Sequence, residues 1–114
     1  MKFLDKEEYY GNIEYKLFIN SKKKERLLSQ FFFRMREGSG KACYFIGITD
    51  FGHLYITNIK CLLYSINKFI SIIHKHSKFK VRIFVKKPYI FSIIYLYNSS
   101  IQHTNDIIDF NIFH

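Results

Sequence analysis

A run of apolar residues at helical spacing between residues 58 and 75 constrains the fold of this chain more than any other feature. Seven apolar side chains recur there at intervals of one, three or four residues, over about four turns. This period gathers them on one face, and a helix with one apolar face must cover a second layer to bury it. We therefore predict a helix from Asn58 to Lys75 whose buried face consists of Ile59, Leu62, Leu63, Ile66, Phe69, Ile70 and Ile73.

A second helix is predicted over Lys22 to Arg36. Asn20 and Ser21 offer a side-chain cap at its start, and Gly38 is a typical residue to end it. Its apolar residues also fall on one helical face, and they are Leu27, Leu28, Phe31, Phe32 and Met35.

Five segments around these helices have the composition or alternation of β-strands. The segment from Phe79 to Val85 alternates strictly, so that one face is apolar and the other carries Lys80, Arg82 and Phe84. Residues 50–53 read as a tight turn, and residues 87–88 as another. The last segment is apolar on both faces, as a central strand would be. The predicted strands are Asn12–Ile19, Ala42–Thr49, Leu54–Thr57, Phe79–Val85 and Tyr89–Tyr97.

These elements predict an α+β fold. Their order is β-α-β-β-α-β-β, which suits a two-layer sandwich with both helices packed on one face of a mixed sheet. A chain of 114 residues with 48% hydrophobic content supports one core. We expect a single domain over residues 1–114, with a core at about 12–98 and a loosely defined tail at 99–114.

Charge is distributed unevenly along the chain, which has a formal net charge of +9. Residues 51–105 contain eight basic side chains and no acidic one. Codon bias toward lysine accounts for extra basic residues but not for the missing acids. Such a surface attracts nucleic acid or an acidic membrane in a salt-dependent way. We favour RNA, because basic charge at this density is typical of RNA-binding domains.

The sequence carries no sign of export or membrane insertion. Charges interrupt the first residues before an apolar stretch develops, so no secretory signal is expected. The longest apolar run, residues 89–97, has about half the length of a membrane-spanning helix. We expect a cytoplasmic protein with no membrane partner, in which Cys43 and Cys61 are reduced thiols.

The segment Glu37-Gly38-Ser39-Gly40-Lys41 has some letters of a nucleotide-binding loop without its pattern. Met35 stands where the first glycine belongs, Ala42 follows the lysine, and the segment leads from helix to strand. Two readings stay open. The glycines are either a plain helix stop or a phosphate cradle formed by exposed amides beside Arg34, Arg36 and Lys41.

Further candidate RNA contacts lie outside this loop. The turn at 50–53 carries two side chains that could stack on a base, although partial burial of Phe51 is the favoured reading. The first helix begins with a lysine run, where the helix dipole disfavours cations unless a phosphate is near. A third group follows the second helix. These candidates are Phe51 and His53, then Lys22, Lys23 and Lys24, and then Lys78, Lys80, Arg82, Lys86 and Lys87.

No catalytic or metal-binding constellation is apparent. His74 and His76 diverge on a helix, and the two cysteines lack the spacing of paired ligands. The acids near the N-terminus read as a flexible acidic patch rather than a catalytic pair. We expect no enzyme activity, no metal, no nucleotide and no cofactor.

A family resemblance accompanies this pattern. The stretch from Glu14 to Gly52 resembles the N-terminal domain of the GTP-binding protein 1 and 2 family of translational GTPases, and the resemblance weakens through residue 86. It rests on residues 14–17, Arg26, Gln30, Arg34, 36–40, Ala42, Tyr44, 46–50 and Gly52. The nucleotide-binding domain of that family is not in this chain. A free-standing domain of this kind resembles the dormancy factors that bind idle ribosomes at the tRNA exit site.

Three hypotheses follow. The resemblance implies a ribosome hibernation factor, monomeric on its target, that contacts ribosomal RNA and nearby ribosomal proteins and excludes deacylated tRNA. The second is a protein-binding module that acts with a GTPase in trans through the aromatic face of Tyr89 to Tyr97. The third is an RNA-processing enzyme that uses His53 as an acid or base.

Overall fold

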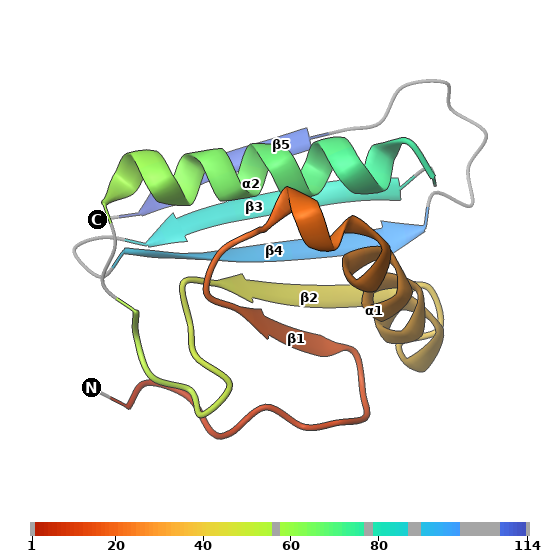
Figure 1. Ribbon diagram of the computed structural model, residues 1–114, viewed down its shortest axis with the longest axis horizontal. Coiled ribbons are helices and arrows are strands. Elements are labelled where there is room, and N and C mark those ends of the chain that lie inside the picture. Colours follow the sequence, from red (N-terminus) through yellow and green to blue (C-terminus); the bar gives the residue numbers. More distant parts are fainter. Residues whose placement is uncertain (1, 56–57, 77–78, 87–89, 99–107, 114) are drawn as a thin grey trace.

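A mixed five-stranded sheet forms one layer of the protein and two helices form the other (Figure 1). The structure, a computed structural model, describes residues 2–55, 58–76, 79–86, 90–98 and 108–113. Strands β1 and β2 are parallel, as are β3 and β5, whereas β4 is antiparallel to both of its neighbours. The sheet order is β1-β2-β4-β3-β5, with β1 at Ile13–Lys16, β2 at Lys41–Ile46, β3 at Phe79–Lys86, β4 at Phe91–Asn98 and β5 at Ile108–Phe113.

Both helices form where their periodicity and caps predict. Helix α1 (Lys24–Glu37) follows a 3₁₀ turn at Ser21–Lys23, and the Asn20 side chain accepts the Lys22 N–H at 3.0 Å. Helix α2 (Ile59–His74) starts at Asn58, whose side chain accepts the Cys61 N–H at 2.8 Å. These side chains satisfy amides that have no partner within the helix.

The main core lies between the helices and one face of the sheet. Both helices contribute buried side chains to the same cluster, including Phe31 from α1 and Phe69 from α2. The Tyr44 ring of β2 lies 4.5 Å from that of Phe69, between centroids. Figure 1 shows both helices on the same side of the sheet. The predicted α+β class and two-layer arrangement are confirmed, and β4 is a central strand as expected.

The predicted hairpin after β2 is present in reduced form. Gly52 has a φ of +85° and its N–H reaches the Thr49 carbonyl at 2.9 Å, which confirms the turn. The returning segment forms an isolated bridge between Leu54 and Ile48 instead of a longer strand. Residues 56–57, and the turn predicted at 87–88, lie outside the described residues.

Strand β5 lies within the tail that the sequence analysis left loosely defined. It pairs in parallel with β3, from Val81 opposite Ile108 to Lys86 opposite Phe113. The alternation of Ile108, Phe110 and Ile112 with polar residues is a strand signal. The parallel partner of this strand is distant in sequence, so the pairing cannot be inferred from the local pattern.

Candidate nucleic-acid interface

The sheet face opposite the helices is divided into two ends. At one end the N-terminal segment covers it, and Leu4 packs on a small cluster formed by Tyr15, Ile48 and Phe91. We call this the closed end. The rest of the face, over Lys41, Lys80, Tyr95 and Tyr97, is called the open end. The register of the strands places these four side chains together, because residues directly opposite each other project from the same face.

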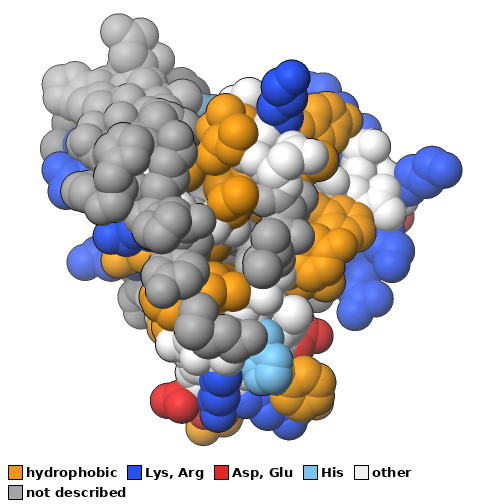
Figure 2. All heavy atoms as spheres, turned by 90° about the vertical axis from the view of Figure 1, so that its left-hand side faces the viewer, with side chains coloured by type: hydrophobic (Ala, Val, Ile, Leu, Met, Phe, Trp, Pro, Cys, Tyr) orange, Lys and Arg blue, Asp and Glu red, His pale blue; other side chains and the backbone are white. Residues whose placement is uncertain are grey.

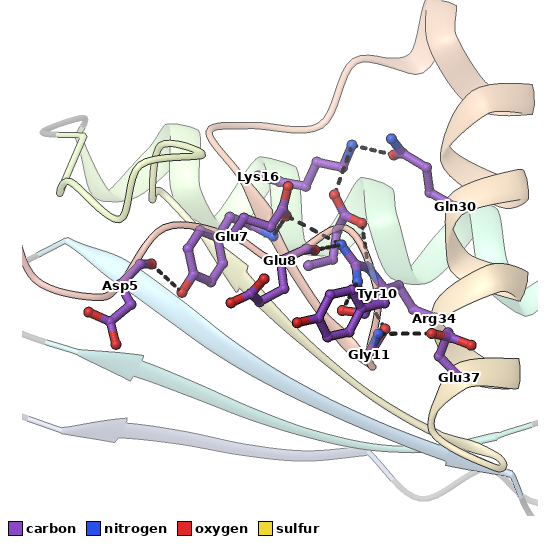
Figure 3. A network of polar contacts seen from close by, with 11 residues as sticks. Asp5, Glu7, Glu8, Tyr10, Gly11, Lys16, Gln30, Arg34 and Glu37 are labelled. Carbon is purple, nitrogen blue, oxygen red and sulfur yellow. Dashed lines mark hydrogen bonds and ion pairs between the residues drawn. The ribbon is translucent and has the colours of Figure 1, made fainter.

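Arg34 holds the N-terminal segment in place (Figure 3). Its Nε donates to Glu14 at 2.9 Å, and its terminal nitrogens donate to the carbonyls of Glu8, Tyr10 and Gly11 at 2.8–3.0 Å. The residue is 3% exposed. The prediction that Arg34 contacts RNA is therefore wrong, because its guanidinium is buried and its donors are engaged within the protein.

The acids near the N-terminus also have structural roles. The Glu7 carboxylate accepts the Tyr15 N–H at 2.5 Å and lies 3.9 Å from an Arg34 nitrogen. Glu37, at the end of α1, accepts the Gly11 N–H at 3.0 Å. Because these contacts fasten residues 7–11 to β1 and α1, the expected flexible acidic patch is replaced by an anchored segment.

Glu7 titrates close to neutrality. Burial is the largest cause and raises its pKa to about 7, and the nearby carboxylates of Glu14 and Asp50 act in the same direction. The hydrogen bond from the Tyr15 N–H opposes this shift by stabilising the ionised form. The closed end therefore contains a carboxyl group that gains a proton at a pH where ordinary carboxylates are ionised.

The open end combines two basic groups that are far apart in sequence. Lys41 of β2 and Lys80 of β3 both stand opposite Tyr97 of β4, on its two sides. With neighbouring strands about 4.8 Å apart, their backbones are about 10 Å from each other. Arg82, two residues after Lys80 on the same face of β3, stands opposite Tyr95. The structure thus brings the segment Glu37-Gly38-Ser39-Gly40-Lys41, called the glycine loop below, and the basic strand β3 to the same end of the sheet.

The glycine loop itself differs from the predicted cradle. The N–H groups of Gly38, Ser39 and Gly40 donate to the carbonyls of Arg34, Arg36 and Met35 at 2.7–3.2 Å. These bonds close helix α1, so the three amides are engaged and the amide cradle is not formed. Of the loop and its flanks, the exposed side chains of Arg36, Ser39 and Lys41 remain candidate contacts.

The lysine run at the start of α1 is not part of the open end. Lys22, Lys23 and Lys24 are exposed, and α1 is about 21 Å long, so they lie about that far from the glycine loop at its other end. In the second basic cluster, Lys86 stands opposite Phe91 at the closed end. Lys78 and Lys87 lie outside the described residues.

Phe51 and His53 lie at the opposite end of β2 from the glycine loop. Phe51 is 61% exposed, so its expected partial burial is wrong, and Lys6 Nζ lies 5.6 Å from its ring centroid. Gly52 between them lies against the Leu4 carbonyl; its N–H donates to Thr49 within the turn, and its carbonyl accepts the N–H groups of Phe3 and Leu4 in the N-terminal segment. Figure 2 shows this end of the molecule, where lysine and arginine side chains lie among exposed hydrophobic ones.

Two tyrosines of β4, Tyr95 and Tyr97, belong to this surface. Tyr95 is 42% exposed, and its ring makes an edge-on contact with Phe84 at 5.7 Å between centroids. The aromatic face of residues 89–97 was predicted as a protein-binding surface. The register shows instead that Tyr95 and Tyr97 stand among cations, which the β4 sequence alone does not reveal.

A cleft of about 640 Å³ lies between the N-terminal segment, β1 and α1. Its walls include the carboxylates of Glu7 and Glu14 together with Lys16, Gln30 and Arg34. Lys16 bonds Gln30, and Glu14 bonds Arg34, so these polar groups satisfy one another. The cleft is therefore explained by the anchoring of the N-terminal segment.

Within the described residues, no three His, Cys, Asp or Glu side chains gather where they could hold a metal ion. Both cysteines are free thiols, and burial raises the pKa of Cys43 to about 12, which keeps it protonated. In the described part of the chain, no helix is long and apolar enough to cross a membrane.

The fold and its second face together define a two-layer α+β domain with a basic, aromatic sheet surface. Compared with protein-family models, curated proteins and solved structures, the chain has no match.

Proposed function

We propose that this protein is a non-enzymatic RNA-binding domain that uses the open end of its sheet to bind ribosomal RNA. The observation that carries the proposal is the convergence of Lys41 and Lys80 on either side of Tyr97. Two cations about 10 Å apart on an exposed face can each neutralise a phosphate of one RNA backbone. Arg36 and Ser39, exposed at the end of α1 and in the turn that precedes Lys41, supply further polar contacts.

Charge complementarity favours RNA over a protein partner. Of the residues in β1 to β4, one is acidic, and this residue, Glu14, bonds Arg34 on the helix side of the sheet. In β5, Asp109 stands in register with Arg82. A surface for an apolar protein partner would be poor in lysine at its centre. The alternative of an accessory module acting with a GTPase in trans is therefore the second choice.

The proposal that the RNA target is ribosomal rests on the family resemblance. Several residues that carry it, including Glu14, Gln30 and Arg34, form the network that anchors the N-terminal segment. The resemblance thus concerns how this domain is built. We propose on this resemblance that the chain is similar to microsporidian dormancy factor 1. We propose that it acts in the cytoplasm as a monomer that occupies the tRNA exit site and keeps ribosomes inactive.

Co-sedimentation with ribosomes across a salt series tests this proposal. The protein should travel with ribosomes at low salt and be released as salt rises, because its affinity depends on displaced counterions. Lys41→Ala/Lys80→Ala should be released at lower salt than the parent protein. Lys60→Ala/Lys75→Ala removes two exposed lysines from α2 and its end, and this matched control should behave like the parent.

A competition experiment with tRNA tests whether the protein occupies the tRNA exit site. Deacylated tRNA in excess should displace the protein from ribosomes if both occupy the exit site. Absence of the protein from the ribosomal peak at low salt would contradict ribosome binding. Binding that persists unchanged at high salt would favour the protein-binding alternative, because apolar burial is insensitive to salt.

A further inference from the structure

Tyr95 and Tyr97 form a pair of neighbouring aromatic side chains on one exposed sheet face. Residues two apart on a strand project to the same side, about 7 Å from each other. Tyr95 is 42% exposed, and Tyr97 is partly exposed. The Phe84 ring packs against the Tyr95 ring at an interplanar angle of 85°, and the Tyr95 side chain remains partly exposed to a ligand.

The two lysines beside these rings are placed to contact the phosphates of an RNA backbone rather than its bases. Lys41 and Lys80 come from the two strands that flank β4, so they lie to either side of Tyr97. Surfaces that bind single-stranded nucleic acid combine such features, with bases stacked on aromatic rings and phosphates near lysines. A duplex hides the faces of its bases and can use the lysines alone.

We propose that Tyr95 and Tyr97 stack on unpaired bases, so that the ligand of the open end is single-stranded RNA. This inference rests on the proposed function and adds the class of RNA to it. The phosphates of the strand lie near Lys41 and Lys80, and each tyrosine ring receives one base. A nearby paired region contributes phosphate contacts without being read by the tyrosines.

The composition of the chain offers a direct probe of this stacking. The protein contains no tryptophan, so Tyr95→Trp introduces a single indole at the proposed site. Titration with a short single-stranded RNA should quench its fluorescence, because a base stacks on the ring. The matched control is Tyr64→Trp, which replaces a 61% exposed tyrosine on α2. Its fluorescence should change little.

Affinity measurements by anisotropy complete the test. Tyr95→Leu should weaken binding of the single-stranded RNA by about tenfold. Tyr95→Phe should bind this RNA as tightly as the parent protein, because stacking needs the ring and not the hydroxyl. A duplex of the same sequence should bind less tightly and be insensitive to Tyr95→Leu. Circular dichroism of each variant checks that the fold is kept.

The outcomes separate this inference from the proposed function. Equal affinity for single-stranded and duplex RNA, with no quenching of the Tyr95→Trp indole, would overturn the stacking and leave a lysine-based RNA interface. Failure to bind either RNA or ribosomes would overturn both. If Tyr95→Leu does not fold, the quenching of Tyr95→Trp by single-stranded RNA, but not by duplex, decides the question.

Discussion

The two ends of the sheet face opposite the helices use charge in contrasting ways. The N-terminal segment that covers the closed end is fastened by the buried cation Arg34, which lies on the helix side of the sheet with the acids Glu7 and Glu14 beside it. At the open end, Lys41 and Lys80 stand beside partly exposed tyrosines. The excess of positive charge therefore has a structural reason. The acids Glu7, Glu14 and Glu37 bond groups within the protein, whereas Lys41 and Lys80 stand on the open face of the sheet.

Replacing the buried Arg34 should have the largest effect, and the quantity affected is the free energy of unfolding. Arg34→Ala leaves the Glu14 carboxylate buried without its partner and frees the carbonyls of residues 8–11, so we expect the free energy of unfolding to fall by about 3–5 kcal/mol. Urea unfolding measures this. Arg36→Ala, an exposed arginine on the same helix, should change it by less than about 0.5 kcal/mol. Equal effects of both variants would contradict a structural role for Arg34.

Removal of the two lysines of the open end should affect binding more than stability. For Lys41→Ala/Lys80→Ala, we expect RNA affinity at low salt to fall about tenfold, or about 1.4 kcal/mol. The slope of log affinity against log salt should become shallower by about one to two, one phosphate contact per lysine. Anisotropy titrations at several salt concentrations measure both. An unchanged slope would remove these lysines from the interface.

The protonation of Glu7 should give the closed end a pH dependence. Its pKa in the folded protein is raised to about 7 from an ordinary value of 4.5, so the folded state binds the proton more tightly than the unfolded state. The stabilisation is complete below about pH 4.5 and is lost as pH rises through 7. Unfolding free energy should decrease by on the order of 1 kcal/mol over this range.

Glu7→Gln is the variant that checks this linkage. The amide keeps an oxygen that accepts the Tyr15 N–H but cannot ionise, so the decrease in stability between pH 4.5 and 7 should become smaller. A pH dependence identical to that of the parent protein would assign the titration to another group.

The smallest effect is expected at the start of α1, away from both ends. Lys24→Glu replaces a cation in the first helical turn, where the dipole favours an acid, and should stabilise the protein by about 0.5 kcal/mol. Thermal unfolding measures this gain. The same variant should weaken RNA binding less than Lys41→Ala does. A larger loss of affinity for Lys24→Glu would move the interface to α1.

The sequence predicts the fold well because both helices and the main strands have clear periods. The apolar face of α2 and the alternation in β3 each follow from local spacing. Strand β5 shows the limit of such reasoning. Its residues alternate, but its partner β3 is more than twenty residues earlier and is found only when the chain folds.

The candidate site is less predictable because it depends on contacts between distant segments. Arg34 lies three residues after Phe31 on the buried face of α1, which is a local sign of burial, but its partner Glu14 is 20 residues away. Charge singles out Lys41, and charge together with strand alternation singles out Lys80. Their meeting with Tyr97 requires the register of β4 against both β2 and β3, which no local pattern contains.

Ultraviolet crosslinking of the protein to single-stranded RNA, followed by mass spectrometry of the crosslinked peptides, tests the central claim most directly. Crosslinks should map to Tyr95, Tyr97 and the peptides that contain Lys41 and Lys80. Crosslinks confined to the turn at Phe51 and His53, or to the lysine run at the start of α1, would contradict the assignment of the RNA interface to the open end.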